Sequence, residues 1–181
     1  MSENQLIKDE HLLKQFCKGN TLAFENLYSR YFAKLLYFIS STIGNKEIAK
    51  DILQEVFIKV VENKCKFNFD KKFSVWVYSI ASNMCKNYFA HNKVVQKAEA
   101  EILYKTNIAE DKNNFQTERK KLVRNAINKL DTKHKQVFIL RNSYSFSFKE
   151  IADILDISEG TVKSRMFNSV KKIKESIHLK E

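Results

Sequence analysis

The sequence predicts an all-α protein, and its composition supports this before any motif is considered. The chain has 181 residues, with no proline and three glycines. Folds rich in β-strands need many tight turns, which favour glycine and proline, so this composition argues against them. Apolar residues instead recur at helical spacing along most of the chain. The net charge of +11 points to a polyanionic partner.

Charge divides the chain into two basic modules and a connecting segment. Lys and Arg exceed Asp and Glu by five in residues 1–93 and by seven in residues 120–181, whereas residues 94–119 carry a net charge of −1. Within the connecting segment the apolar periodicity is lost near Asn107. We therefore expect two small helical domains, 1–93 and 120–181, joined by a flexible linker over residues 94–119.

The first module should contain four helices, each with apolar residues every three or four positions. They are expected at residues 6–17, 24–43 and 46–62, and from Phe73 onward. Gly44 can end the second helix, and Asn45 can cap the third. Trp76 shares one face of the fourth helix with other apolar residues, so we expect this side chain to pack in the core.

The second module should contain four more helices. They are expected at residues 120–130, 132–142, 147–155 and 159–177. Ser147 and Glu150 have the spacing of a capping box, and Ser158 can cap the last helix. A turn of about three residues between the last two helices is typical of a DNA-reading helix-turn-helix.

The outward face of the last helix is the candidate DNA-reading surface of the second module. Its side chains can reach base edges and phosphates. They are Thr161, Lys163, Ser164, Arg165 and Asn168. A plain helical hairpin with a solvated polar face is the alternative for this segment taken alone.

Three motifs in this order resemble RNA polymerase sigma factors of the extracytoplasmic-function (ECF) group. They are DILQEVF at residues 51–57, FSVWVYSIASN at residues 73–83, and the helix-turn-helix at residues 146–166. The resemblance implies that residues 1–93 are region two, which binds core polymerase and recognises and melts the minus-ten element. Residues 120–181 would be region four, which reads the minus-thirty-five element. Such a protein directs transcription initiation, is not an enzyme and needs no cofactor.

Polymerase contacts are expected on the helix at residues 46–62. Ile52, Val56 and Val60 should point inward, which leaves a mixed acidic and apolar outer face. That face consists of Asp51, Gln54, Glu55 and Ile58. Such a face in a basic module suggests a protein partner. The resemblance implies that this partner is the clamp helices of the largest polymerase subunit, while region four binds the flap of the second large subunit.

Contacts with minus-ten DNA are expected from the loop at residues 63–72 and from the polar side of the fourth helix. These side chains combine amide, cationic and aromatic groups, which can hold unpaired bases and their phosphates. The candidates are Lys64, Asn68, Asn83, Lys86, Asn87, Tyr88 and His91.

Five positions depart from the pattern of the family. Phe167 and Asn168 stand where polar and basic residues are usual, so the minus-thirty-five sequence of the family is not carried over to this chain. Ser145 and Asp156 stand where glycine is frequent, and a left-handed backbone is expected at Asp156. Asp131 stands where proline often opens a helix, and Asp is a competent N-cap.

Two other classes of function remain open. An autonomous helix-turn-helix regulator would leave the match at residues 51–57 unexplained. A helical enzyme such as a nuclease is disfavoured, because the four histidines lie far apart with no metal or nucleophile constellation. Members of the ECF group are commonly held by an anti-sigma factor, so such a partner is a further expectation.

The compartment is inferred from the cysteines and from the absence of sorting signals. Cys17, Cys65 and Cys85 lack metal-binding or redox spacing, so free thiols are expected. The sequence has no signal-peptide pattern and no apolar run long enough to span a bilayer, so we expect a cytoplasmic protein without membrane insertion.

Overall fold

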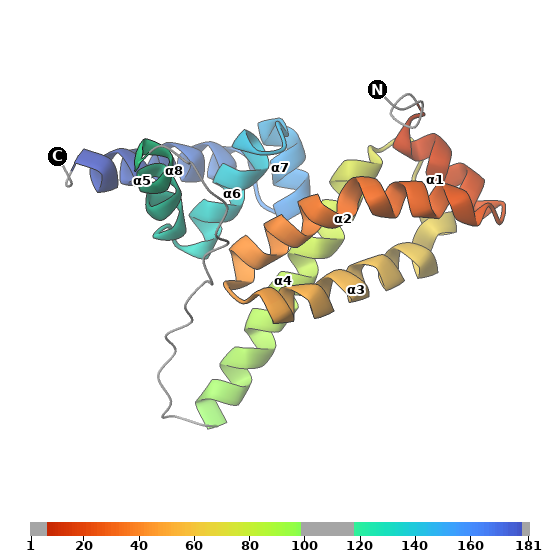
Figure 1. Ribbon diagram of the computed structural model, residues 1–181, viewed down its shortest axis with the longest axis horizontal. Coiled ribbons are helices and arrows are strands. Elements are labelled where there is room, and N and C mark those ends of the chain that lie inside the picture. Colours follow the sequence, from red (N-terminus) through yellow and green to blue (C-terminus); the bar gives the residue numbers. More distant parts are fainter. Residues whose placement is uncertain (1–6, 99–117, 179–181) are drawn as a thin grey trace.

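The computed structural model describes residues 7–98 and 118–178, and its regular elements are all helical (Figure 1). This confirms the all-α class. The elements are α1 (Asp9–Cys17), α2 (Thr21–Ile43), α3 (Lys46–Asn63), the 3-10 helix η2 (Lys64–Lys66), α4 (Phe73–Ala98), α5 (Glu118–Asn128), α6 (Thr132–Asn142), α7 (Phe148–Leu155) and α8 (Glu159–His178).

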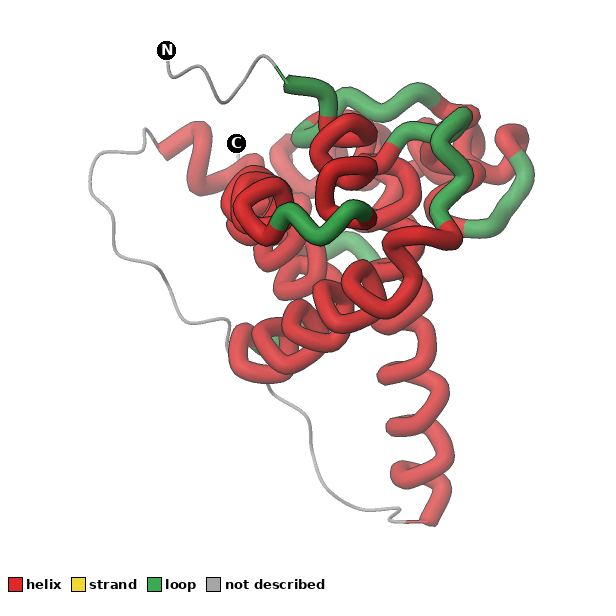
Figure 2. The backbone as a smooth tube through the Cα atoms, turned by 90° about the vertical axis from the view of Figure 1, so that its right-hand side faces the viewer, coloured by secondary structure: helices red, strands yellow, loops and turns green. Residues whose placement is uncertain are grey.

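The first part of the predicted linker is helical. Helix α4 continues to Ala98, past the expected domain boundary at residue 93, and its C-terminal turns extend beyond the other helices (Figures 1 and 2). Helix α5 begins at Glu118, two residues before the expected second domain. Residues 99–117, which make up the rest of the predicted linker, lie outside the described residues.

Capping residues set several of the helix boundaries. Gly44 ends α2 in the left-handed conformation, with φ of 83°, and Asn45 accepts hydrogen bonds from the amides of Glu47 and Ile48 at the start of α3. These caps are the ones predicted for this turn. The left-handed backbone expected at Asp156 is also present, with φ of 55°. Ser145 adopts the same conformation, with φ of 59°, which costs a residue with a Cβ roughly 1 kcal/mol.

The core of the first module lies where α2 packs on α1, α3 and α4. Leu35, Phe38 and Ile39 of α2 are fully buried there. Trp76 is half-buried, and its ring packs 5.0 Å from Phe67, so the core role expected for Trp76 is confirmed. The four-helix arrangement follows from the apolar stripes, because each helix has one face to bury.

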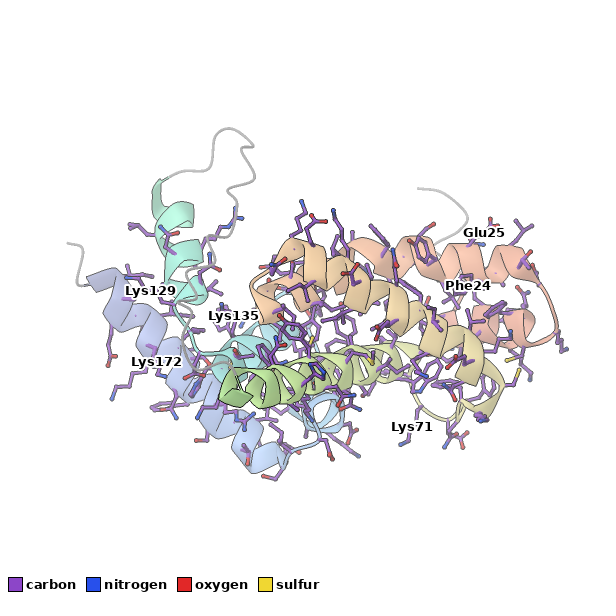
Figure 3. All side chains as sticks on the ribbon, turned by 90° about the horizontal axis from the view of Figure 1, so that it is seen from below. Phe24, Glu25, Lys71, Lys129, Lys135 and Lys172 are labelled. Atoms are coloured by element: carbon purple, nitrogen blue, oxygen red, sulfur yellow. The ribbon has the colours of Figure 1, made fainter. Side chains whose placement is uncertain are left out.

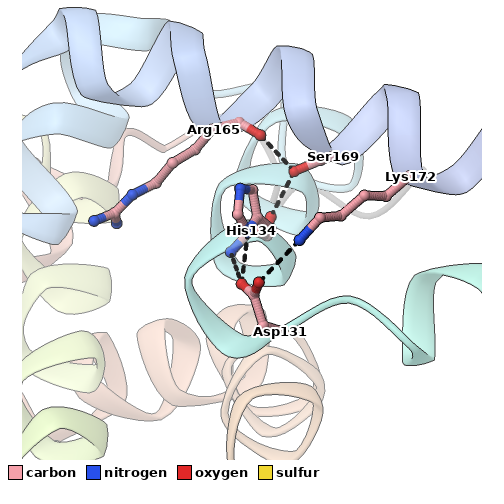
Figure 4. Close-up of polar contacts among 5 residues, drawn as sticks. All are labelled: Asp131, His134, Arg165, Ser169 and Lys172. Carbon is pink, nitrogen blue, oxygen red and sulfur yellow. Dashed lines mark hydrogen bonds and ion pairs between the residues drawn. The ribbon is translucent and has the colours of Figure 1, made fainter.

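A network of polar contacts joins the start of α6 to α8 (Figure 4). Asp131 caps α6 by accepting a hydrogen bond from the amide of His134, and its carboxylate contacts His134 Nδ1 at 2.6 Å and Lys172 Nζ at 3.1 Å. The buried hydroxyl of Ser169 bridges the carbonyl oxygens of His134 and Arg165. These contacts position the helix that carries the candidate DNA-reading residues.

The ionised form of Asp131 is favoured by this network. Partial burial alone would raise its pKa, but the hydrogen bonds from His134 and Lys172 lower it from 3.8 to about 2. Because the folded-state pKa lies below the ordinary value, the carboxylate stabilises the fold fully above about pH 4. This stabilisation is lost as the pH falls toward 2.

The two modules pack on each other through α4 against α7 and α2 against α6, and they share one hydrophobic core. The ring of Tyr78, on α4, lies 4.9 Å from that of Tyr144 and 5.2 Å from that of Phe146. The Tyr144 hydroxyl donates a 2.6 Å hydrogen bond to the carbonyl of Lys34 on α2. Residues from α2, α4 and the α6–α7 turn therefore meet in one aromatic contact.

The first prediction concerns this aromatic contact. Replacing Tyr144 with Ala should lower the free energy of unfolding by about 2–3 kcal/mol, because a half-buried ring and its hydrogen bond are lost. Tyr144→Phe keeps the ring and should cost only about 1 kcal/mol. Urea unfolding measures both values. Equal losses for the two variants would contradict a packing role for the ring.

The second prediction concerns Asp131. At pH 7, Asp131→Ala should lower the free energy of unfolding by about 1–2 kcal/mol through loss of the cap. Asp131→Asn keeps a capping oxygen but loses the charge, so it should cost less. The difference between the native protein and Asp131→Asn should shrink as the pH falls from 4 toward 2, where the native carboxylate becomes protonated. A difference independent of pH in that range would refute the electrostatic account.

Candidate nucleic-acid interface and protein-binding face

The helix-turn-helix predicted near the C-terminus is formed by α7 and α8. Both halves of the capping box are present: Ser147 Oγ accepts from the amide of Glu150, and the Glu150 carboxylate accepts from the amide of Ser147. Ser158 Oγ accepts from the amide of Thr161 at the start of α8. The left-handed Asp156 reverses the chain between these two caps. Local sequence therefore determines where both helices begin and how the turn is made.

Apolar side chains hold the two helices of this unit together. Ile151 and Leu155 of α7 and Val162 of α8 are fully buried. The half-buried side chains of Ala152, Ile157 and Met166 pack against these residues and complete the small core. The predicted small core is thus present, and it directs the opposite face of α8 outward.

The five candidate residues of α8 differ in accessibility. Lys163, Ser164 and Asn168 are exposed. Thr161 is half-buried, and its hydroxyl lies 2.8 Å from that of Ser158. Arg165 is half-buried at its base, and its guanidinium extends away from His134 and Ser169 (Figure 4). Lys163 Nζ contacts the Glu159 carboxylate at 2.7 Å. Such a surface ion pair contributes little to stability, so a DNA phosphate can take the place of the carboxylate.

The predicted outer face of α3 is present. Asp51, Gln54, Glu55 and Ile58 are all exposed, whereas Ile52, Val56 and Val60 are buried. Ile58 keeps 54% of its surface in contact with solvent, which is unusual for a large apolar side chain and typical of an interaction site. The acidic and apolar side chains therefore share one accessible surface.

An apolar groove of about 640 Å³, which we call the α2–α3 groove, lies beside this face. Its lining includes Gln54 and Ile58 from the predicted polymerase-binding set. The other lining residues are Phe24, Tyr28, Phe32, Lys50, Leu53, Phe57, Val61 and Glu62. Sequence analysis did not single out the aromatic residues of α2 as a binding surface, yet Tyr28 and Phe32 are more than a third exposed. The apolar stripe of α2 is wider than the area that its packing partners cover. That width was the one feature of the sequence that could have indicated an exposed apolar surface on α2.

The candidate minus-ten residues lie in two places. Lys64 is in η2, with its ammonium 4.2 Å from the centre of the Phe16 ring, and the exposed Asn68 accepts a hydrogen bond from the amide of Asp70. Both precede α4. The other candidates lie between Asn83 and His91 in the middle of α4, and Asn87 lies about 20 Å along the helix from its start. The seven residues therefore do not form one compact patch.

Within α4, the candidates do not share one environment. Asn83, Lys86, Asn87 and His91 are exposed. Tyr88 instead is partly buried against the hydrophobic core. The helical positions of the four exposed residues place them on one side, and Tyr88 points away from that group.

Two basic side chains near this surface contact the second module. Lys86 Nζ donates a 2.7 Å hydrogen bond to the carbonyl of Leu155, at the end of α7. Lys72 Nζ contacts the Glu150 carboxylate at 2.8 Å, and this pair raises the pKa of Lys72. The packing of the two modules therefore occupies one of the predicted DNA contacts, Lys86.

Other lysines lie at the two ends of the molecule (Figure 3). Lys129, Lys135 and Lys172 lie together at the end formed by α5, α6 and α8, whereas Lys71 lies in the loop before α4 at the other end. Lys135 is half-buried, and burial lowers its pKa, while its ammonium donates to the carbonyl of Asn128. Positive charge thus flanks both modules.

The described residues contain no group of three or more His, Cys, Asp or Glu side chains placed to hold a metal ion. Across residues 7–98 and 118–178, none of the helices combines the length and the apolarity that crossing a membrane requires. The three cysteines are free thiols, as predicted.

Comparison with known proteins places this geometry in a family. Residues 27–94 match the family Sigma-70 region 2, and residues 120–173 match Sigma-70, region 4. The chain is 30% identical over 165 residues to the ECF RNA polymerase sigma factor SigW of Bacillus subtilis, covering 85% of this chain and 88% of the relative. It is 30% identical over 180 residues to the ECF RNA polymerase sigma-E factor of Escherichia coli K12, covering 93% of both chains.

Solved structures share the fold. The sigma factor RpoE of Bartonella quintana, in complex with the anti-sigma factor NepR, superposes with a TM-score of 0.75 at 19% identity, covering 87% of this chain and 98% of that one. CnrH in complex with the cytosolic domain of CnrY gives a TM-score of 0.68 at 21% identity, covering 96% and 99%. With both regions matched in order and whole-length relatives at this identity, the chain belongs to the ECF RNA polymerase sigma factors.

Proposed function

We propose that this sigma factor binds core RNA polymerase through the outer face of α3 together with the α2–α3 groove. The observation that carries the proposal is the exposed acidic and apolar surface around Glu55 and Ile58, in a protein whose net charge is +11. DNA would be repelled by the carboxylates there, whereas a basic and apolar protein surface would be complementary. The clamp helices of the largest polymerase subunit are the proposed partner, with the flap of the second large subunit contacting the second module.

Promoter recognition is proposed to divide between the modules. Lys163, Ser164, Arg165 and Asn168 would enter the major groove of the minus-thirty-five element, because α8 is the second helix of the helix-turn-helix. Thr161 would contact the backbone near the start of α8, where amides and helix dipole favour a phosphate. Lys64 and Asn68, with the exposed residues of α4, would contact the minus-ten element.

The packed arrangement of the modules bears on this promoter contact. Lys86 donates to the Leu155 carbonyl in the packed arrangement, so we propose that the modules separate when promoter DNA is engaged and that this frees the ammonium for a DNA phosphate. The hydrogen bonds and ion pairs between the modules are few and partly exposed. Contacts of this kind contribute little net energy in water and can be exchanged for contacts with polymerase and DNA.

Further partners and the compartment are also proposed. The sigma factor RpoE of the same fold was captured with the anti-sigma factor NepR, and an inhibitory protein partner is accordingly proposed for this chain. Action in the cytoplasm, where polymerase and the chromosome meet, follows from the same role. The protein supplies binding and specificity to polymerase and carries out no bond chemistry of its own.

The third prediction tests base reading by Arg165. Arg165→Ala should lower promoter-specific transcription about 10- to 100-fold, because one bidentate contact with a base is worth ~1–3 kcal/mol. Core binding should be unchanged. Arg165→Lys keeps the positive charge but loses the planar guanidinium that donates two parallel hydrogen bonds. If Arg165 reads a base, transcription with Arg165→Lys should be as low as with Arg165→Ala. If Arg165 contacts only phosphate, Arg165→Lys should restore transcription. In vitro transcription and core pull-down are the measurements, and loss of core binding would refute the role.

The fourth prediction tests the polymerase face. Glu55→Lys should reduce affinity for core polymerase at least tenfold, because it places a cation where a basic partner surface is expected. The matched control is Glu25→Lys, the same charge change at an exposed position of α2. Both variants should keep the native thermal stability. Fluorescence anisotropy with purified core enzyme measures affinity, and equal affinity for the two variants would remove α3 from the interface.

A further inference from the structure

Two cysteines that are far apart in the sequence meet at one end of the first module. Cys17 is the last residue of α1 and Cys65 lies in η2, and these two elements pack directly on each other. The residues before them also touch, since Lys64 Nζ lies 4.2 Å from the centre of the Phe16 ring. The Cys65 thiol is also near enough to contribute to the raised pKa of the Cys17 thiol.

The two thiols differ in their surroundings. Cys65 is exposed, whereas Cys17 is partly covered. Burial is the main cause that raises the pKa of Cys17 to about 11, and the contact with Cys65 adds to it, while the charge of Lys64 opposes it. Cys17 is therefore protonated at neutral pH, and Cys65 is the sulfur that a solute reaches first.

We propose that Cys17 and Cys65 are a redox-sensitive pair that forms an intramolecular disulfide when the protein meets hydrogen peroxide. The contacts proposed above with DNA and polymerase do not use these thiols. Disulfides in a reducing compartment are usually transient and regulatory, and an exposed thiol beside a second, partly covered thiol is suited to reversible oxidation.

The reaction balances with peroxide as the oxidant. The Cys65 sulfur attacks one peroxide oxygen, the O–O bond breaks, and the released hydroxide takes the Cys65 proton and leaves as water. The Cys17 sulfur then attacks the sulfenic sulfur of Cys65, the S–O bond breaks, and the second hydroxide takes the Cys17 proton. Two thiols and one peroxide thus give one disulfide and two waters, with two electrons passing from sulfur to oxygen.

The bond would link α1 to η2 around the chain segment that contains α2 and α3. A cross-link that closes so long a loop restricts the unfolded chain and stabilises the fold. It would also anchor the start of the loop that leads into α4. The third cysteine, Cys85, is fully buried, and burial raises its pKa to about 12, so it serves as an internal control.

The experiment uses the full-length protein. Reduced protein is treated with hydrogen peroxide, denatured, and labelled with N-ethylmaleimide before digestion and mass spectrometry. We expect a monomer with a peptide linking Cys17 to Cys65 and with label on Cys85 alone, and dithiothreitol should restore all three labelled thiols. The melting temperature of the oxidised monomer should be higher by roughly 5–15 °C.

Two variants distinguish a disulfide between Cys17 and Cys65 from other products of cysteine oxidation. Cys65→Ser, a change at an exposed position, should abolish both the linked peptide and the rise in melting temperature. Cys17→Ser should leave Cys65 as a sulfenic acid that dimedone traps. The proposal is overturned if the oxidised monomer keeps three labelled thiols, if oxidation yields only dimers linked through Cys65, or if Cys85 is found in the bond.

Discussion

The aromatic contact of Tyr78 with Tyr144 and Phe146 is the constraint on which the arrangement of the molecule depends. It joins α4 of the first module to the turn between α6 and α7, and the Tyr144 hydroxyl extends the contact to α2. Through it, the cores of both modules become one continuous hydrophobic cluster. The place of the helix-turn-helix relative to the first module follows from this contact, because α7 lies directly on α4.

The same packing decides which functional surfaces are accessible together. The outer face of α8 and the α3 face remain open, whereas Lys86 is held by the end of α7. The polar contacts between the modules involve Lys72, Lys86 and the Tyr144 hydroxyl, at the edge of an aromatic contact. The lysine contacts are easily exchanged for contacts with other molecules, whereas the aromatic contact belongs to the hydrophobic core that the modules share.

Within the first module, opposite faces of one helix have separate tasks. The inward side of α3 fills the core, while Glu55 and Ile58 on its outer side border the groove lined by α2. The acidic side chains there are an exception in a chain that is basic overall. Their negative charge would repel DNA, so DNA would bind at other surfaces of the molecule. Beyond the C-terminal end of α3, Cys65 of η2 lies near Cys17 of α1, next to the loop before α4.

The sequence by itself determined the helices, their caps and the inward and outward faces, because these depend on neighbours within about four positions. The capping box at Ser147 and Glu150, the N-cap at Asp131 and the left-handed Asp156 are all of this local kind, and all are present. Only the tertiary structure decided that Tyr78 meets Tyr144, that Lys86 contacts Leu155 and that Cys17 lies beside Cys65. These contacts join positions with no fixed periodicity between them, so they arise from how whole helices pack.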